Sequence, residues 1–194
     1  MLQQSPSQTV GPFFHDGLIF GGENILVNDR TQGEQIYIEG QVLDGDGVPV
    51  VDALVEIWQA DANGYFNHPA DPGQSKADPF FAGFGRSQSA KEGRLGRATC
   101  FGFKTVKPGI IASEDQKQAP HISVHVFARG MLIHALTRLY FSDEHANQSD
   151  PVLNSVPEAR QHTLIAQRQA VQGLPTYRFD IHLQGEEETV FFNP

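Results

Sequence analysis

Residues 35–60 read QIYIEGQVLDGDGVPVVDALVEIWQA, and this stretch decides the fold class. Apolar and polar residues alternate in its first part, with Ile36, Ile38 and Val42 on one face, and the alternation returns in ALVEIWQA. A period of two is typical of a half-buried β-strand. Between the two parts, DGDGVPV at 44–50 carries Asp-Gly pairs that permit positive φ, which predicts a hairpin turn.

The rest of the chain continues as short strands separated by turns. The segments with strand character are CFGFKTV (100–106), HISVHVF (121–127), LTRLYF (136–141), YRFDIHL (177–183) and TVFF (189–192). With 19 glycines and 12 prolines, this pattern predicts a mostly β protein, an antiparallel β-sandwich.

One segment breaks the strand pattern, SVPEARQHTLIAQRQAVQG at 155–173. It opens with a Ser-x-x-Glu capping arrangement at Ser155 and Glu158, with a proline between them. No breaker follows until Gly173, a suitable C-terminal stop. The sequence therefore predicts one helix appended to the sandwich.

The length of 194 residues suits one domain. We expect a long N-terminal arm at 1–35, which lacks regular structure and packs on a partner, and a single β-sandwich domain at 36–194. Within that domain, residues 62–97 form a long excursion rich in Gly, Pro, Asp and Ser. Connections of this length are usually functional or bind a partner.

Composition excludes several functions. The formal net charge of −9 argues against nucleic acid or an anionic membrane as the main partner. The single cysteine, Cys100, forbids an intramolecular disulfide and is better interpreted as a small buried residue than as a nucleophile. With neither a signal-peptide pattern nor an apolar run long enough for a membrane span, we expect a cytoplasmic protein.

The stretch APHISVHVFARG at 119–130 looks like half of a metal site. His121 and His125 share one face of a predicted strand, but four residues separate them by about 13 Å. Their rings cannot easily converge on one ion, because a metal–nitrogen bond is only about 2.1 Å long. Taken alone, the two histidines are better interpreted as a packed or hydrogen-bonded pair.

At this point the chain resembles a known family, the intradiol ring-cleavage dioxygenases. The resemblance runs nearly end to end, through PSQTVGPFF, GQVLDGDGVPVVDALVEIWQADANGYF, DPFFAGFGR, VKPGII, APHISVHVFARG, TRLYFSDE and YRFDIHLQGEEETVFF. Within the family, the chain is most similar to alpha subunits of two-chain members.

The resemblance implies a metal site that this chain has lost. Catalytic chains of the family hold ferric iron through two tyrosinates and two histidines. Here the first tyrosine is missing from PGQSKADPFF, and Ile111 stands where the second is expected. The histidine strand reads His121-Ile122-Ser123, so only His121 remains, and Gln118 replaces an expected arginine. Because a lone neutral histidine cannot replace the anionic oxygens that select Fe(III), we expect no metal in this chain.

The resemblance also implies a partner. In two-chain members a beta subunit holds the Fe(III), and alpha forms a wall of its active-site cleft. The substrate is a catechol that bears a carboxylate, cleaved with O2 between its two hydroxylated carbons. We expect no catalytic residue and no activity in this chain alone. The substrate-binding residues carried over to it are Thr9, Gly11, Pro12, Phe13 and Arg129.

Other interpretations stay open for these residues. The arm could be a frayed terminus, although exposed Phe13 and Phe14 favour docking on a partner. Arg129 could form a surface salt bridge of little value. For the whole chain, one alternative is an inactive, self-associating pseudoenzyme that binds another small molecule near His121. Another is an independent metalloenzyme built from His121 and unforeseen ligands.

Overall fold

The computed structural model describes residues 11, 17–112 and 116–193. Within them, eight strands form one sheet in the order β4–β3–β8–β9–β10–β11–β1–β5. The pairs β1–β11 and β9–β10 are parallel, and the other neighbours in the sheet are antiparallel. The strands are β1 Gln35–Gly40, β2 Val42–Leu43, β3 Leu54–Trp58, β4 Phe84–Gln88, β5 Phe101–Val106, β6 Ile111–Ala112, β7 Lys117–Gln118, β8 His121–Phe127, β9 Ala135–Phe141, β10 Ile165–Gln169, β11 Thr176–Arg178 and β12 Ile181–His182.

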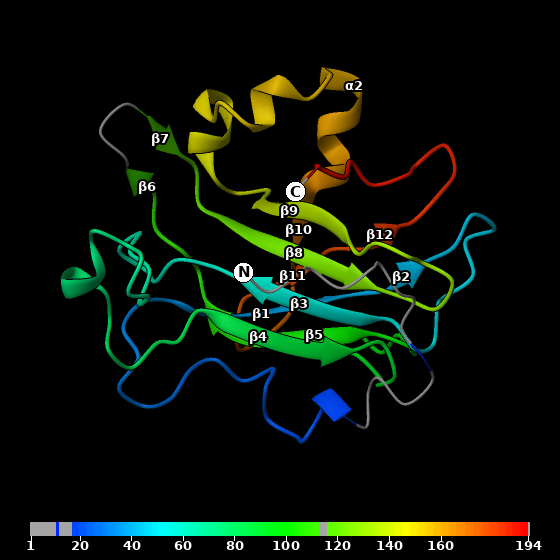
Figure 1. Cartoon of the computed structure of the whole chain (residues 1–194), viewed down its shortest axis with the longest axis horizontal. Coiled ribbons are helices and arrows are strands. Elements are labelled where there is room, and N and C mark those ends of the chain that lie inside the picture. The colour runs from blue at the N-terminus through cyan, green and yellow to red at the C-terminus, as the bar shows by residue number, and fades with distance from the viewer. Residues whose placement is uncertain (1–10, 12–16, 113–115, 194) are drawn as a thin grey trace, which may run out of the picture.

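The long sheet folds into two layers. In Figure 1, β4, β3, β8 and β9 lie in front, and the strands from β10 to β5 lie behind them. The buried faces of both halves form one core, which includes Ile36 and Ile38 of β1, Phe103 of β5, and Val124 and Val126 of β8. The mostly β fold expected from the alternating pattern is therefore confirmed.

The two ends of the sheet lie side by side. Ser87 of β4 accepts a hydrogen bond from the backbone N–H of Gly102 in β5, at 3.1 Å from its Oγ. Just beyond these strands, Lys91 and Cys100 form an antiparallel bridge. The sandwich is thus joined along the seam between its first and last strands.

The Asp-Gly turn forms a small hairpin in which Leu43 of β2 is bridged to Pro49, but the longer strands on either side, β1 and β3, do not pair with each other. Asp44 N donates to Val48 O at 3.0 Å, and Gly47 has φ +75°. Beyond this small turn, β1 pairs with β5 and β11, while β3 pairs with β4 and β8. The alternating pattern correctly marks both strands, but it does not reveal that they belong to different layers.

The helix predicted at 155–173 is present, but it is much shorter than predicted. The segment contains only one turn of α-helix, α2 at Glu158–Gln161, followed by a 3-10 turn, η4 at His162–Leu164. Pro157 occupies the N-cap position, and Ser155 Oγ instead donates to Val152 O at 2.7 Å. The other 3-10 turns are η1 Gln74–Lys76, η2 His145–Ser149 and η3 Leu153–Ser155. In the described part of the chain, no helix is long and apolar enough to cross a membrane.

The second half of the same segment is strand β10, whose place in the sheet explains the error. Ile165 pairs with Tyr140 of β9, and Gln167 pairs with Arg178 of β11. Without β10, the facing backbone groups of β9 and β11 would lose their partners, which is costly in a folded interior. Tertiary pairing thus overrides the helix propensity of Ala, Gln and Arg.

Two further segments depart from the sequence pattern. The excursion at 62–97 contains β4, an edge strand that pairs along all of β3. TVFF at 189–192 contributes only an isolated bridge between Phe192 and Leu136. The later part of the predicted arm packs on this domain, because Leu26 and Val27 belong to its core.

Candidate functional site

The positions assigned to the lost metal site lie around the first residues of β8. His121 pairs with Tyr140 and Ser123 pairs with Arg138, both of β9. Residues i and i+2 of a strand project to the same side, so His121 and Ser123 share the face of β8 opposite to Ile122 and Val124, which lie in the core. This outer face carries the candidate site.

The other two positions meet in a short hairpin beside this face. Ile111 of β6 pairs with Gln118 of β7. Gln118 Oε1 accepts a hydrogen bond from Arg138 Nη1 at 2.9 Å. Arg138 is also the register partner of Ser123, so Gln118 contacts the guanidinium directly, Ser123 lies opposite Arg138 on the neighbouring strand, and Ile111 is the register partner of Gln118.

His121 is neutral and held in one tautomer. Its side chain is buried, and Nδ1 lies 2.8 Å from Ala119 O. A carbonyl oxygen only accepts, so Nδ1 carries the hydrogen and Nε2 keeps its lone pair. Burial foremost, and then the positive charge of Arg138, lower the pKa of His121 to about 4. At neutral pH this imidazole therefore stays uncharged.

The buried carboxylate of Asp150 holds the segments around the site together. Asp150 is 1% exposed and accepts hydrogen bonds from Ala119 N at 2.8 Å and from Tyr140 OH at 3.0 Å. It also accepts from Val152 N at 3.0 Å and Leu153 N at 2.8 Å. Tyr140, which the alternation in LTRLYF marks as a packed strand residue, is fully buried as expected. Asp150 thus ties the strand that carries His121 to the helical segment.

Sequence reasoning missed Arg138 and Asp150. Asp150 precedes Pro151 and accepts from the N–H groups two and three residues on, an arrangement typical of Asp before a helical turn. That motif could have been noticed in QSDPVLN. Nothing local points to Arg138, because its partner Gln118 lies 20 residues away.

The donor set does not fit ferric iron. Among the four positions, His121 offers one neutral nitrogen, Ser123 a hydroxyl and Gln118 an amide, and Ile111 has no donor. Fe(III) favours anionic oxygen ligands, which this set lacks. Among the described residues, no group of three or more His, Cys, Asp or Glu side chains could hold a metal ion.

His121 and His125 do not converge, in agreement with their spacing. His125 instead stacks on His134, with ring centroids 5.0 Å apart. His134 also stacks on Phe127, at 5.2 Å. Burial, followed by the neighbouring His134, lowers the pKa of His125. This packed aromatic cluster occupies the outer face of β8 farther along the strand.

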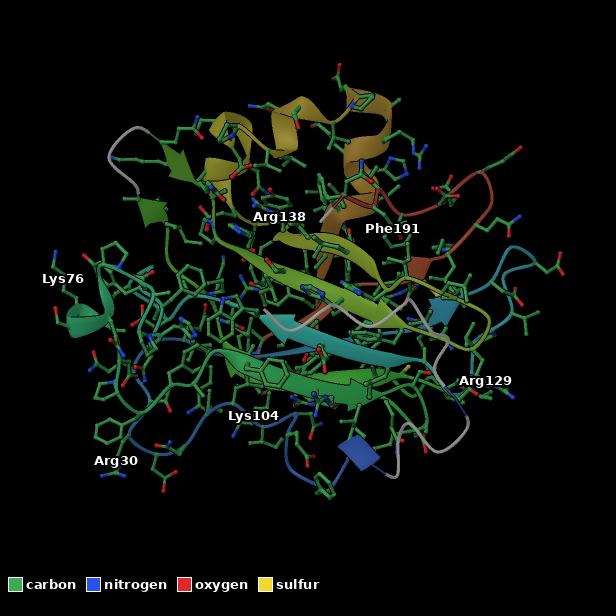
Figure 2. The ribbon with its side chains drawn as sticks, in the orientation of Figure 1. Arg30, Lys76, Lys104, Arg129, Arg138 and Phe191 are labelled. Atoms are coloured by element: carbon green, nitrogen blue, oxygen red, sulfur yellow. The ribbon has the colours of Figure 1, made fainter. Side chains whose placement is uncertain are left out.

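Of the residues expected to reach a partner's site, the structure describes only Gly11 and Arg129. Thr9, Pro12 and Phe13 lie outside the described residues. Gly11 is exposed, and no heavy atom lies within 4 Å of the position that a Cβ would take there. Arg129 lies just after the end of β8 (Figure 2), with a side chain 61% exposed, and forms an ion pair with Asp52. The structure does not bring Arg129 to the cluster around His121.

Cys100 shows no sign of a nucleophile. It is 2% exposed, and burial raises the pKa of its thiol. Its Sγ lies within hydrogen-bond range of two backbone carbonyl oxygens, those of Arg97 and Ala98. The interpretation of Cys100 as a small buried residue is confirmed.

Comparison with known proteins defines the class. A family model described as Dioxygenase (Dioxygenase_C) matches residues 10–185, and the chain therefore belongs to this dioxygenase family. A protocatechuate 3,4-dioxygenase alpha chain from Burkholderia cepacia is 44% identical over 203 residues, covering 99% of this chain and 98% of that one. The beta chain from the same organism is 33% identical over 190 residues, covering 94% and 77%. The resemblance to intradiol ring-cleavage dioxygenases is thereby confirmed.

Solved structures support the same fold. The dioxygenase domain of a dioxygenase–carbohydrate-binding protein fusion from Streptomyces sp. SirexAA-E aligns with a TM-score of 0.61 at 23% identity. The alignment covers 93% of this chain and 99% of that one. At this identity the likeness shows the fold alone.

Proposed function

We propose that this chain is the non-iron alpha subunit of a protocatechuate 3,4-dioxygenase. It pairs with an iron-bearing beta subunit, and the pair cleaves protocatechuate between its two hydroxyls with O2 to give 3-carboxy-cis,cis-muconate. The observation that carries the proposal is the donor set of His121, Ser123, Gln118 and Ile111, which does not fit Fe(III), in a chain that matches an alpha chain end to end. The cofactor is then Fe(III) held by beta, and the compartment is the cytoplasm.

In this proposal, the contribution of the chain is to shape the partner's cleft. The arm residues Thr9, Gly11, Pro12 and Phe13 cover the bound aromatic ring, since Gly-Pro makes an extended segment that approaches a ligand closely. The guanidinium of Arg129 meets the substrate carboxylate. A planar guanidinium matches a carboxylate in shape and charge. The exposure of Arg129 at a strand end supports this role.

The experiment compares this chain alone, a matching beta chain alone, and the two combined. Iron content, visible absorption and oxygen consumption with protocatechuate are measured for each. We expect the isolated chain to be colourless and inactive, and the combination to show tyrosinate-to-Fe(III) absorption and turnover. Stoichiometric iron with turnover in the isolated chain would refute the subunit role. A stable homo-oligomer that does not bind the beta chain would favour the pseudoenzyme alternative.

Replacing Arg129 with alanine tests the contact with the carboxylate. We expect Arg129→Ala to raise the KM for protocatechuate by about tenfold, the value of one charge-assisted hydrogen bond, with a smaller change in kcat. The measurement is steady-state oxygen uptake by the assembled enzyme. Catechol, which lacks the carboxylate, provides a control substrate whose kcat/KM stays the same.

A matched variant separates this contact from a general loss of surface charge. Arg30 is also exposed, and its guanidinium lies 4.1 Å from the ring centroid of Phe80. Arg30→Ala removes the same charge and should leave the KM for protocatechuate unchanged. An unchanged KM in Arg129→Ala would show that Arg129 does not bind the substrate and only forms its ion pair with Asp52.

A further inference from the structure

The ion pair between Arg129 and Asp52 joins two separate segments at one end of the sandwich. We propose that Asp52 is a positioning residue for the reaction of the assembled enzyme, and that it holds the Arg129 guanidinium in the orientation that meets the substrate carboxylate. The inference rests on the proposed function, because it deepens the role given there to Arg129. It adds a second residue to that contact and explains how a long, exposed side chain is ordered before the substrate binds.

The register of the sheet places the two residues opposite each other. β3 and β8 are antiparallel neighbours, and Leu54, the first residue of β3, pairs with Phe127, the last residue of β8. Asp52 lies two residues before Leu54 and Arg129 lies two residues after Phe127, so the same register extends to this pair. Side chains directly opposite each other on neighbouring strands lie close together, and opposite charges at such positions attract. The topology of the sandwich therefore brings Asp52 to Arg129.

Asp52 projects from a turn that is fixed on both sides. Ser89, which follows β4 and is completely buried, donates from Oγ to Val50 O at 2.5 Å, and the same Oγ accepts from Ala53 N at 3.0 Å. Ser89 N also donates to Ala53 O at 2.9 Å. These hydrogen bonds hold the backbone on either side of Asp52, whose own side chain is 21% exposed. The carboxylate thus belongs to a rigid part of the protein.

Arg129 projects from a turn that leaves its side chain mostly open to water. It comes two residues after the end of β8, and Gly130 next to it has φ +85°, a left-handed conformation that glycine adopts readily. In Figure 2, Arg129 lies at the right-hand end of the molecule, towards which β8 points. An arginine side chain has many rotamers, and ordering it when a ligand binds weakens the affinity by about two- to tenfold. An ion pair that forms beforehand removes part of that cost.

The guanidinium can bind Asp52 and a second carboxylate at the same time. Asp52 Oδ2 contacts Nε of Arg129. Arginine has five N–H donors in a planar fork, and its two Nη groups form a further edge that matches the two oxygens of a carboxylate. Because these edges of the guanidinium face different directions, contact of Nε with Asp52 directs the Nη edge away from Asp52. In the assembled enzyme, this Nη edge meets the substrate carboxylate.

The negative charge of Asp52 also repels the substrate carboxylate, and this effect has the opposite sign. Both members of the ion pair are partly exposed, so water and salt weaken the repulsion. The guanidinium charge lies between the two carboxylates and offsets the repulsion further. Holding Arg129 in place therefore has the larger effect. Tighter substrate binding after removal of the Asp52 carboxylate would contradict the inference.

The test measures steady-state oxygen uptake by this chain combined with a matching beta chain, for variants of residue 52. We expect Asp52→Ala to raise the KM for protocatechuate by about fivefold, with a smaller change in kcat, because Arg129 must then be ordered during binding. Asp52→Glu retains the carboxylate and should bring the KM back to within about twofold of the parent value. Catechol, which lacks the carboxylate, should keep the same kcat/KM in both variants. The matched control Asp46→Ala removes a carboxylate at an exposed position of the neighbouring turn and should leave the KM unchanged.

A double-substitution cycle shows whether Asp52 acts through Arg129. In an Arg129→Ala background, Asp52→Ala should cause no further rise in KM, because the side chain that Asp52 positions is gone. Additive effects of the two substitutions would refute the positioning role. A KM that is unchanged or lowered in Asp52→Ala, while Arg129→Ala raises it, would overturn the inference and leave the subunit role intact. An absence of turnover in the combined chains would instead reject the proposed function, and the inference with it.

An NMR measurement on the isolated chain does not depend on turnover. The signal of the Arg129 Nε–H group should move towards that of a free arginine in Asp52→Ala and stay near its parent position in Asp46→Ala. An unchanged signal in Asp52→Ala would show that Asp52 does not hold the guanidinium, and the inference would then be rejected. Urea unfolding curves should match the parent curve, since an exposed ion pair contributes little to stability. If Asp52→Ala does not fold, Asp52→Asn keeps the shape of the side chain and gives the same comparison with a smaller effect.

Discussion

Asp150→Asn is expected to lower the free energy of unfolding by about 3 kcal/mol. It places an amide NH2 group, which can only donate, at a buried site where the surrounding groups donate hydrogen bonds to residue 150. The carboxylate accepts from Ala119 N, Val152 N, Leu153 N and Tyr140 OH, all within 3.0 Å. An asparagine has the same shape, but its amide nitrogen cannot accept. At least one of these four donors is then left without a partner in the interior. Urea unfolding of the isolated chain measures the loss.

The matched control is Asp46→Asn, at an exposed position in the turn after β2. It removes the same formal charge where water surrounds the side chain, and its effect should stay within about 0.5 kcal/mol. A loss of less than about 1 kcal/mol in Asp150→Asn would mean that the site relaxes and that the framework joining β8 to the helical segment is loose.

Stability should also fall as the pH drops from about 6.5 towards 4, and His121 should cause a large part of the fall. Its pKa is about 4 in the folded chain but about 6.5 in an unfolded chain. Between these values the unfolded state binds more protons, so the free energy of unfolding rises with pH. The stability is complete above the unfolded value and declines as pH falls through this window, by about 3 kcal/mol in total at 1.36 kcal/mol per unit.

The measurement is urea unfolding at several pH values in this window, for the parent chain and for His121→Gln. The variant should lose the His121 part of the slope, and the remaining slope belongs to carboxylates such as Asp143 and Asp180, whose folded pKa values are lowered. A control, His68→Gln, alters an exposed histidine and is measured at the same pH values. Parallel curves for the parent and His121→Gln would contradict the burial argument.

The strands could be predicted because the alternation of apolar and polar residues that marks each strand lies within the strand's own sequence. Alternation marked β1, β3, β5, β8 and β9 closely, since each has one face in the core. The helix was predicted too long because the choice between helix and strand at Ile165–Gln169 depends on the gap between β9 and β11. The sequence of that segment contains no information about this gap, because residues elsewhere in the chain form it.

Part of the candidate site could likewise be predicted from the sequence, and part could not. Family membership pointed to His121, Ser123, Gln118 and Ile111, because the motifs around them are contiguous in the sequence. Arg138 acts through register, since its relation to Ser123 exists only once β9 pairs with β8. A replaced ligand can be recognised in a motif, whereas a residue that reaches the site from a neighbouring strand must be seen in three dimensions.

The seam between β4 and β5 limits how this protein can assemble. Most sheets end in two strands with free backbone groups, which can recruit a strand from another molecule. Here the terminal strands face each other, linked by Gly102 N to Ser87 Oγ and by the bridge between Lys91 and Cys100. Growth by strand addition is thereby blocked at this edge. A subunit contact at this seam must then be made by side chains and loops, so changes of surface side chains there can retune the choice of partner and leave the sandwich intact.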